Sequence, residues 1–201
     1  MNKIKNEFNA DSYFQKALKK LGEFNNTKEI LYYIALDYRF CIERLLFEYL
    51  VLVKNSQVSI TLQKLYRAYD LSKAIMKAEP NFFKKLEFVN IYMGCLGKKE
   101  KIIIPDLERL TKIYSGLNKF LHAPKRTDQS IADTKSLGKF IELIDLATDT
   151  LGELLSHPRG VIQLNDKGLD LFERFANSKI YKEELIKEIQ EELTKFNQNS
   201  H

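Results

Sequence analysis

The sequence predicts an all-α fold, a helical bundle of about six to eight helices. Apolar residues recur every three or four positions in almost every segment, which is the spacing of one helix face. The 201 residues include only 8 glycines and 4 prolines, and only 102–104 and 161–164 resemble short strands. With 44% hydrophobic and 29% charged residues, the composition is typical of a folded globular chain.

The first two helices are expected at 11–24 and 27–54. Asp11 and Ser12 are the expected N-terminal caps of the first helix, and Thr27 is that of the second. The second helix has the strongest periodic signal and should be central to the bundle. Its apolar stripe consists of Ile30, Ile34, Tyr38, Cys41, Leu45, Tyr49 and Leu52.

The polar side of the second helix carries two pairs of opposite charges. Arg39 precedes Glu43, and Arg44 precedes Glu48, both at the i,i+4 spacing of helical ion pairs. Further helices are expected at 61–78, 82–96, 105–123, 134–156, 169–176 and 179–196.

Glycine, proline and capping residues mark several of these boundaries. Gly97 is the expected C-terminal cap of the helix 82–96. Pro105 and Asp106 suit the first turn of the next helix, and Pro124 stops it. The apolar face of the helix 61–78 is expected to contain Leu62, Leu65, Tyr69, Ser72 and Met76.

The chain length favours one main core over two independent domains. We expect residues 1–160 to form the main helical bundle and residues 161–201 to form a C-terminal helical extension. The extension either packs on the bundle or serves a partner.

Charge, cysteine content and missing motifs narrow the class of protein. The net charge of +5 is compatible with a polyanionic partner, but the lysines are scattered over the chain. Cys41 and Cys95 lie in apolar periodic segments, which favours buried thiols in a reduced, cytoplasmic protein. Neither a secretory signal nor a membrane span is expected, because no apolar stretch follows the basic residues near Met1 and no apolar run is long enough to span. Metal-binding and glycine-rich phosphate motifs are absent, so neither metal nor cofactor is expected.

The candidate site is a polar stripe on the helix 105–123. Thr111, Ser115, Asn118 and His122 follow one another at steps of four, three and four, which places them on one helix face. The simpler interpretation is a solvated face that ends in a capping histidine. The functional interpretation makes His122 a general acid or base, with Asn118 and Lys119 converging on a phosphate-bearing ligand.

The order of helices and these residues resemble the HEPN-like helical domains of prokaryotic defence and toxin-antitoxin systems. The resemblance covers about 27–156, with the long helix that carries Arg39 and Glu43 and the helix end that carries Tyr114, Asn118, Lys119 and His122 at the matching place. It implies metal-independent RNA cleavage by an arginine and a histidine at a helix end.

The chain departs from this motif at the arginine. Leu117, Gly116 and Ser115 occupy the positions where that arginine should lie. Arg39 or Arg44 could approach from the long helix, and a groove that joins either of them to His122 would favour an enzyme. Without such a cation we expect little or no cleavage, because charge on a phosphate in the transition state would not be stabilised.

The sequence therefore predicts a HEPN-like component of a defence or toxin-antitoxin system that binds RNA or a cognate protein and pairs with a second copy. The alternatives are a protein-interaction scaffold without a nucleic-acid role and a metal-independent endoribonuclease that uses His122. Residues 164–169 resemble the wing-to-helix passage of winged-helix regulators. DNA binding is nevertheless disfavoured, because the preceding helix carries Asp145, Asp149 and Glu153.

Overall fold

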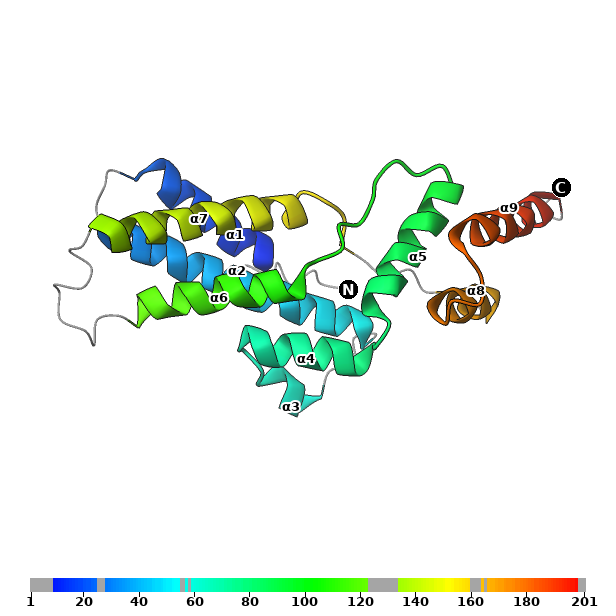
Figure 1. The fold of residues 1–201 in the computed structure, drawn as a ribbon, viewed down its shortest axis with the longest axis horizontal. Coiled ribbons are helices and arrows are strands. Elements are labelled where there is room, and N and C mark those ends of the chain that lie inside the picture. Colours follow the sequence, from blue (N-terminus) through cyan, green and yellow to red (C-terminus); the bar gives the residue numbers. More distant parts are fainter. Residues whose placement is uncertain are drawn as a thin grey trace, which may run out of the picture. The chain divides into compact units, whose positions relative to one another are not determined.

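The computed structural model of the protein describes residues 9–24, 28–54, 57, 59–122, 134–159, 164 and 166–198 (Figure 1). Nine helices and no strand occur in this part of the chain, which confirms the all-α class. The helices are α1 (Ala10–Gly22), α2 (Lys28–Val53), α3 (Ile60–Gln63), α4 (Ala68–Ala78), α5 (Phe82–Cys95), α6 (Leu107–Leu121), α7 (Thr134–Leu155), α8 (Asp166–Ala176) and α9 (Lys182–Gln198). None of these helices is long and apolar enough to cross a membrane.

The chain divides into two compact units. The first consists of Met1–Ala78 and Pro105–Ser156, and the second of Glu79–Ile104 and His157–His201. The helix α5 therefore groups with α8 and α9, whereas the sequence analysis placed it in a bundle of residues 1–160. An amphipathic pattern shows that a helix has a buried face, but it does not identify the helix that covers that face.

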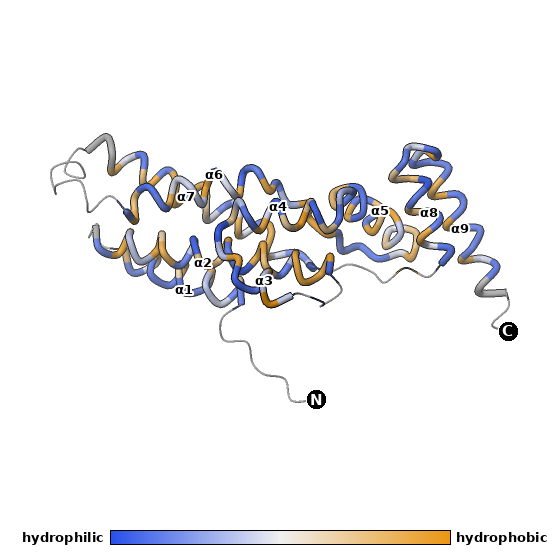
Figure 2. The backbone as a smooth tube through the Cα atoms, turned by 90° about the horizontal axis from the view of Figure 1, so that it is seen from below, coloured by the Kyte–Doolittle hydropathy of each residue, from blue (hydrophilic) through white to orange (hydrophobic). Residues whose placement is uncertain are grey.

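In the first unit, α2 packs against α1, α4, α6 and α7, as expected for a central helix. Figure 2 shows apolar residues recurring along α2 and along the helices of this unit. Contact with four helices requires more than one apolar side, so burial extends beyond the predicted stripe. The fully buried side chains of α2 include Ile34, Tyr38, Cys41 and Leu45 of that stripe, and also Ala35, Ile42, Leu46 and Leu50.

Two side chains fix the N-terminus of α1. Asn9 is the N-cap, because its Oδ1 accepts a hydrogen bond of 2.8 Å from the Ser12 backbone N–H. Glu48 of α2 accepts a hydrogen bond of 3.0 Å from the Ala10 N–H. The predicted capping role of Asp11 and Ser12 is wrong, since both residues lie within the first turn.

The two predicted ion pairs of α2 have different outcomes. Arg39 Nε lies 3.1 Å from Glu43 Oε1, which confirms the first pair. Arg44 and Glu48 form no ion pair in the described part of the chain, since the Glu48 carboxylate turns to the end of α1. Arg44 is exposed as a result.

The predicted helix 61–78 consists of two helices, α3 and α4, joined by residues 64–67. Ser59 caps α3 by accepting a hydrogen bond of 3.4 Å from the Leu62 N–H. In α4 the buried residues are Ala68, Leu71 and Ile75, whereas Tyr69 is 56% exposed. The expectation that Tyr69 faces the core is therefore wrong. Because the helix is interrupted at residues 64–67, the side of α4 that packs against α2 and α6 is not the one that a continuous helix would present.

The helices α6 and α7 approach each other closely at a glycine. A Cβ at Gly116 would lie 2.8 Å from Leu143 Cδ2, so a larger residue fits only if Leu143 moves. One turn further along α6, the rings of Phe120 and Phe140 stack with their centroids 4.2 Å apart. Asp106 caps the start of α6 through a hydrogen bond of 2.8 Å from the Arg109 N–H. The predicted stop at Pro124 lies outside the described residues.

The second unit has a core of its own. It is formed by Phe88, Ile91, Leu171, Phe172, Ala176, Ile180, Leu185 and Ile189. The segment that follows α5 is held by Asn90, whose Oδ1 accepts a hydrogen bond from the Ile102 N–H at 2.7 Å and whose Nδ2 donates to the Ile102 carbonyl at 2.8 Å. Gly97 has a φ of 73°, which suits the predicted helix end. Residues 102–104 are irregular and not a strand.

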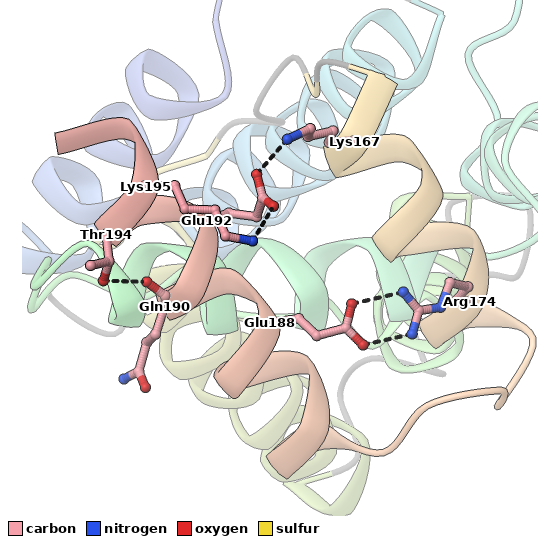
Figure 3. Close-up of polar contacts among 7 residues, drawn as sticks. All are labelled: Lys167, Arg174, Glu188, Gln190, Glu192, Thr194 and Lys195. Atoms are coloured by element: carbon pink, nitrogen blue, oxygen red, sulfur yellow. Dashed lines mark hydrogen bonds and ion pairs between the residues drawn. The ribbon is translucent and has the colours of Figure 1, made fainter. Parts of the chain in front are cut away.

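A bidentate ion pair joins α8 and α9 (Figure 3). Both guanidinium nitrogens of Arg174 donate to Glu188, over 2.7 and 2.6 Å. The apolar face of α9 is occupied in the same unit, because Leu185 and Ile189 belong to its core. Leu185 and Ile189 are therefore covered within the second unit.

The buried hydroxyl of Tyr38 makes the first unit sensitive to alkali. Thr148 Oγ1 donates to the Ile144 carbonyl at 2.8 Å, so the Tyr38 hydroxyl is the donor in its own bond of 2.6 Å to Thr148. Burial raises the pKa of Tyr38. Its contribution to stability is complete below the unfolded pKa of about 10 and is lost as the pH rises through the higher folded pKa.

We expect Tyr38→Phe to cost about 0.5–1.5 kcal/mol at neutral pH and to flatten the decline in stability above about pH 10. Urea denaturation across that pH range measures both effects. Tyr33→Phe is the matched control, because Tyr33 is on the same helix and 59% exposed. An unchanged alkaline slope in Tyr38→Phe would contradict the prediction.

Candidate functional site

A hollow of about 500 Å³ lies at the C-terminal end of α6. We call it the His122 hollow. The helix α6 contributes Tyr114, Ser115, Asn118 and His122, α2 contributes Arg39, and the start of α4 with the segment before it contributes Tyr66, Arg67, Tyr69 and Asp70. All of these residues belong to the first unit. Three stretches of chain that are distant in sequence therefore converge on one surface.

One wall of the hollow is a fixed polar network. The Glu43 Oε1 atom accepts hydrogen bonds from Arg39 Nε at 3.1 Å and from the Tyr114 hydroxyl at 2.9 Å. The Arg39 guanidinium also lies 5.7 Å from the centre of the Tyr114 ring. Burial raises the pKa of Tyr114, and a hydrogen bond with Asn118 opposes that rise. Tyr114 therefore stays a neutral donor, and Arg39 is held in one orientation.

Asn118 leaves one atom available in this wall. Its Oδ1 is buried and has no hydrogen-bond partner among the described residues. A buried acceptor without a partner costs free energy, and such an atom is often satisfied by water or by a ligand. In the candidate site, Asn118 could accept a hydrogen bond from a hydroxyl or an amino group.

The side of the hollow around the start of α4 contains two tyrosine rings, one arginine and one carboxylate: Tyr66, Tyr69, Arg67 and Asp70. Tyr66 is 55% exposed and Tyr69 is 56% exposed, so both rings are open to a ligand. The Arg67 guanidinium lies 5.8 Å from the centre of the Tyr66 ring, and Lys73 Nζ lies 4.4 Å from that of Tyr69. Exposed rings beside cations suit a ligand that carries both flat bases and phosphates.

The hollow contains four of the six residues that the sequence proposed for a site. Ser115, Asn118, His122 and Arg39 line it. Lys119 is exposed and does not line it, because one residue along the helix turns its side chain by about 100°. Arg44 does not line it either. It belongs to a neighbouring hollow.

The first residue of the predicted stripe has a structural role. Thr111 Oγ1 donates to the Leu107 carbonyl at 2.8 Å and lies 3.4 Å from the Ser72 hydroxyl of α4. At the other end of the stripe, His122 is the exposed C-cap of α6 and its backbone N–H bonds the Asn118 carbonyl at 3.0 Å. His122 thus occupies the C-cap position through its backbone, and its side chain lines the hollow.

Sequence reasoning missed the wall formed by Tyr66, Arg67, Tyr69 and Asp70. The available signal was the run 66–69, in which two tyrosines flank an arginine and an alanine. Among the described residues, no group of three or more His, Cys, Asp or Glu side chains is placed to hold a metal ion. Comparison with known protein families, with curated proteins and with solved structures finds no match for this chain.

Proposed function

We propose that the first unit is a HEPN-like domain that binds single-stranded RNA in the His122 hollow. The observation that carries this proposal is that Arg39 and Arg67 meet two exposed tyrosine rings and the polar end of α6 in one hollow. The assignment to a prokaryotic defence or toxin-antitoxin system rests on the resemblance in helix order and helix-end residues.

The chemistry of the hollow suits a single strand better than a duplex. The bases of a single strand can splay out and stack on tyrosine rings and on guanidinium planes. In a paired helix the faces of the bases are not accessible for such stacking. An arginine binds phosphate through several donors at once, and the exposed Arg67 is placed for that contact. The unpartnered Asn118 Oδ1 offers an acceptor for a ribose hydroxyl or a base amino group.

RNA cleavage is the second candidate function. The motif arginine is missing from α6, but Arg39 and Arg67 line the same hollow as His122. A groove of this kind is what would allow a cation from another helix to stabilise negative charge on a phosphate. Arg39 is paired with the Glu43 carboxylate, and Arg67 lies near the Asp70 carboxylate of the same hollow, so neither cation is free of a nearby negative charge. Binding therefore has more support than cleavage.

The test uses a fluorescein-labelled oligouridylate and anisotropy at low salt. Wild-type protein should bind it, and the affinity should fall as salt rises, because phosphate contacts release counterions. We expect Arg67→Gln to weaken binding by about tenfold, in line with the loss of one stacked or ionic contact. Arg109→Gln is the matched control, since Arg109 is an exposed arginine of α6 that does not line the hollow.

His122→Ala separates the site from a solvated face. We expect it to weaken binding while it changes the stability by no more than about 0.3–1 kcal/mol, the usual contribution of a charge at a helix end. Electrophoresis of the same RNA in EDTA measures cleavage in parallel. Cleavage that His122→Ala abolishes would favour the endoribonuclease, and an absence of binding at any salt concentration would contradict the proposal.

Pairing of two copies, which the resemblance implies, stays a prediction. Light scattering at tens of micromolar tests it, and a strict monomer would exclude it.

A further inference from the structure

A second hollow, of about 320 Å³, adjoins the first. Four aromatic rings, one cation, one carboxylate, one amide and one leucine line it: Tyr13, Phe40, Phe47, Tyr66, Arg44, Glu43, Gln63 and Leu65. Tyr66 lines both hollows. We call the second one the Arg44 hollow. Like the first, it lies entirely within the first unit.

The rings of this hollow come from three separate elements. Tyr13 lies on α1, Phe40 and Phe47 lie on α2, and Tyr66 lies before α4. The rings of Tyr13 and Phe40 are tilted by 42° with centroids 5.3 Å apart. Such a cluster presents flat apolar surface at several angles, which fits the insertion of one planar aromatic group. A nucleobase has that shape and stacks on side-chain rings regardless of its identity.

The cation of this hollow is available to a ligand. Arg44 is exposed and forms no ion pair in the described part of the chain, because its i,i+4 neighbour Glu48 binds the end of α1. Arg44 lies five positions after Arg39 on α2, about 7.5 Å further along the axis. Between them, the Glu43 carboxylate that holds Arg39 also lines the Arg44 hollow. Each hollow thus takes one arginine from α2, Arg39 in the first and Arg44 in the second.

We infer that the Arg44 hollow binds a nucleobase of the same RNA strand that occupies the His122 hollow, with Arg44 meeting the adjoining phosphate. This inference rests on the proposed function. The strand passes the edge of Tyr66, so that the two hollows form one extended site. A single nucleotide fills only the first hollow, and a longer strand uses both.

The experiment compares strands of different length by competition. Uridine monophosphate and a tetrauridylate each displace the labelled oligouridylate from full-length protein. For the wild type, we expect the tetranucleotide to compete at least about tenfold better than the mononucleotide, the gain expected from one further stacked base with its phosphate. Arg44→Gln and Phe47→Leu should remove that gain and leave competition by the mononucleotide unchanged.

Lys64→Gln is the matched control, because Lys64 is an exposed cation beside the hollow that does not line it. It should retain the gain with strand length. Thermal denaturation verifies that each variant is folded, and Arg44→Gln tests the inference even if Phe47→Leu is unstable.

The outcomes separate the inference from the proposed function. If the wild type binds RNA and Arg67→Gln weakens it, but Arg44→Gln keeps the gain with length, only the inference is overturned. Equal weakening of both competitors by Arg44→Gln also overturns it, since Arg44 would then act through general electrostatics. If the wild type binds no RNA of any length, both the inference and the proposed function are overturned.

Discussion

Replacing Phe88 by alanine should lower the stability of the second unit by about 3–5 kcal/mol, the usual cost of removing a buried phenylalanine. Phe88 is fully buried and contacts three further rings. Its centroid lies 5.6 Å from Phe172, 6.3 Å from Phe175 and 6.3 Å from Tyr92. Loss of this ring leaves a cavity where α5 packs against α8 and α9.

Hydrogen exchange resolved by mass spectrometry measures where that loss occurs. Amides of α5, α8 and α9 should lose protection, because the core cluster that contains Phe88 belongs to the second unit. Phe83→Ala removes the same ring from the same helix at a position that is 39% exposed, and it should cost less than about 1 kcal/mol. Equal loss of protection in α2 and α6 would show that the two units unfold together.

Leu45→Ala should destabilise the first unit by about 2–5 kcal/mol. Leu45 is fully buried on α2, the helix that packs against four others, so the cavity cannot close by moving a single neighbour. Such a loss is a large part of the stability of an ordinary domain. Urea denaturation followed by circular dichroism measures it. Tyr33→Ala, at an exposed position of the same helix, should change the midpoint little, and a similar shift in both variants would contradict the central role of α2.

The fold class and the central helix could be predicted because helix periodicity is local. The stripe from Ile34 to Leu45 reports burial directly, whatever covers it. The break between α3 and α4 was not predictable, because residues 64–67 keep an apolar residue at a helical spacing and contain neither glycine nor proline. The grouping of α5 with α8 and α9 depends on contacts between segments that are distant in sequence. The periodicity of a single helix does not predict such contacts.

For the candidate site, too, local spacing predicted some residues and tertiary packing decided the others. Ser115, Asn118 and His122 lie on one face of one helix, so their spacing was sufficient to place them together. Arg39 was one of two arginines considered for the same place, and only tertiary packing chooses between them. Tyr66 and Arg67 were missed because their direction is set by the break before α4, and a helix continued through 61–78 places Tyr69 in the core instead.

The division of the second unit between two distant segments has a consequence for the order in which the protein folds during synthesis. The helix α5 ends at Cys95 and its partner α8 begins at Asp166, so the ribosome must add about 70 residues before α5 can be covered. At a typical rate of about 5–20 residues per second, the apolar face of α5 that contains Phe88 stays uncovered for roughly 4–14 s. During that interval the helices of the first unit that follow α5 emerge and pack. Nascent chains halted before residue 166 should therefore bind chaperones through α5, and release of those chaperones should coincide with the emergence of α8 and α9.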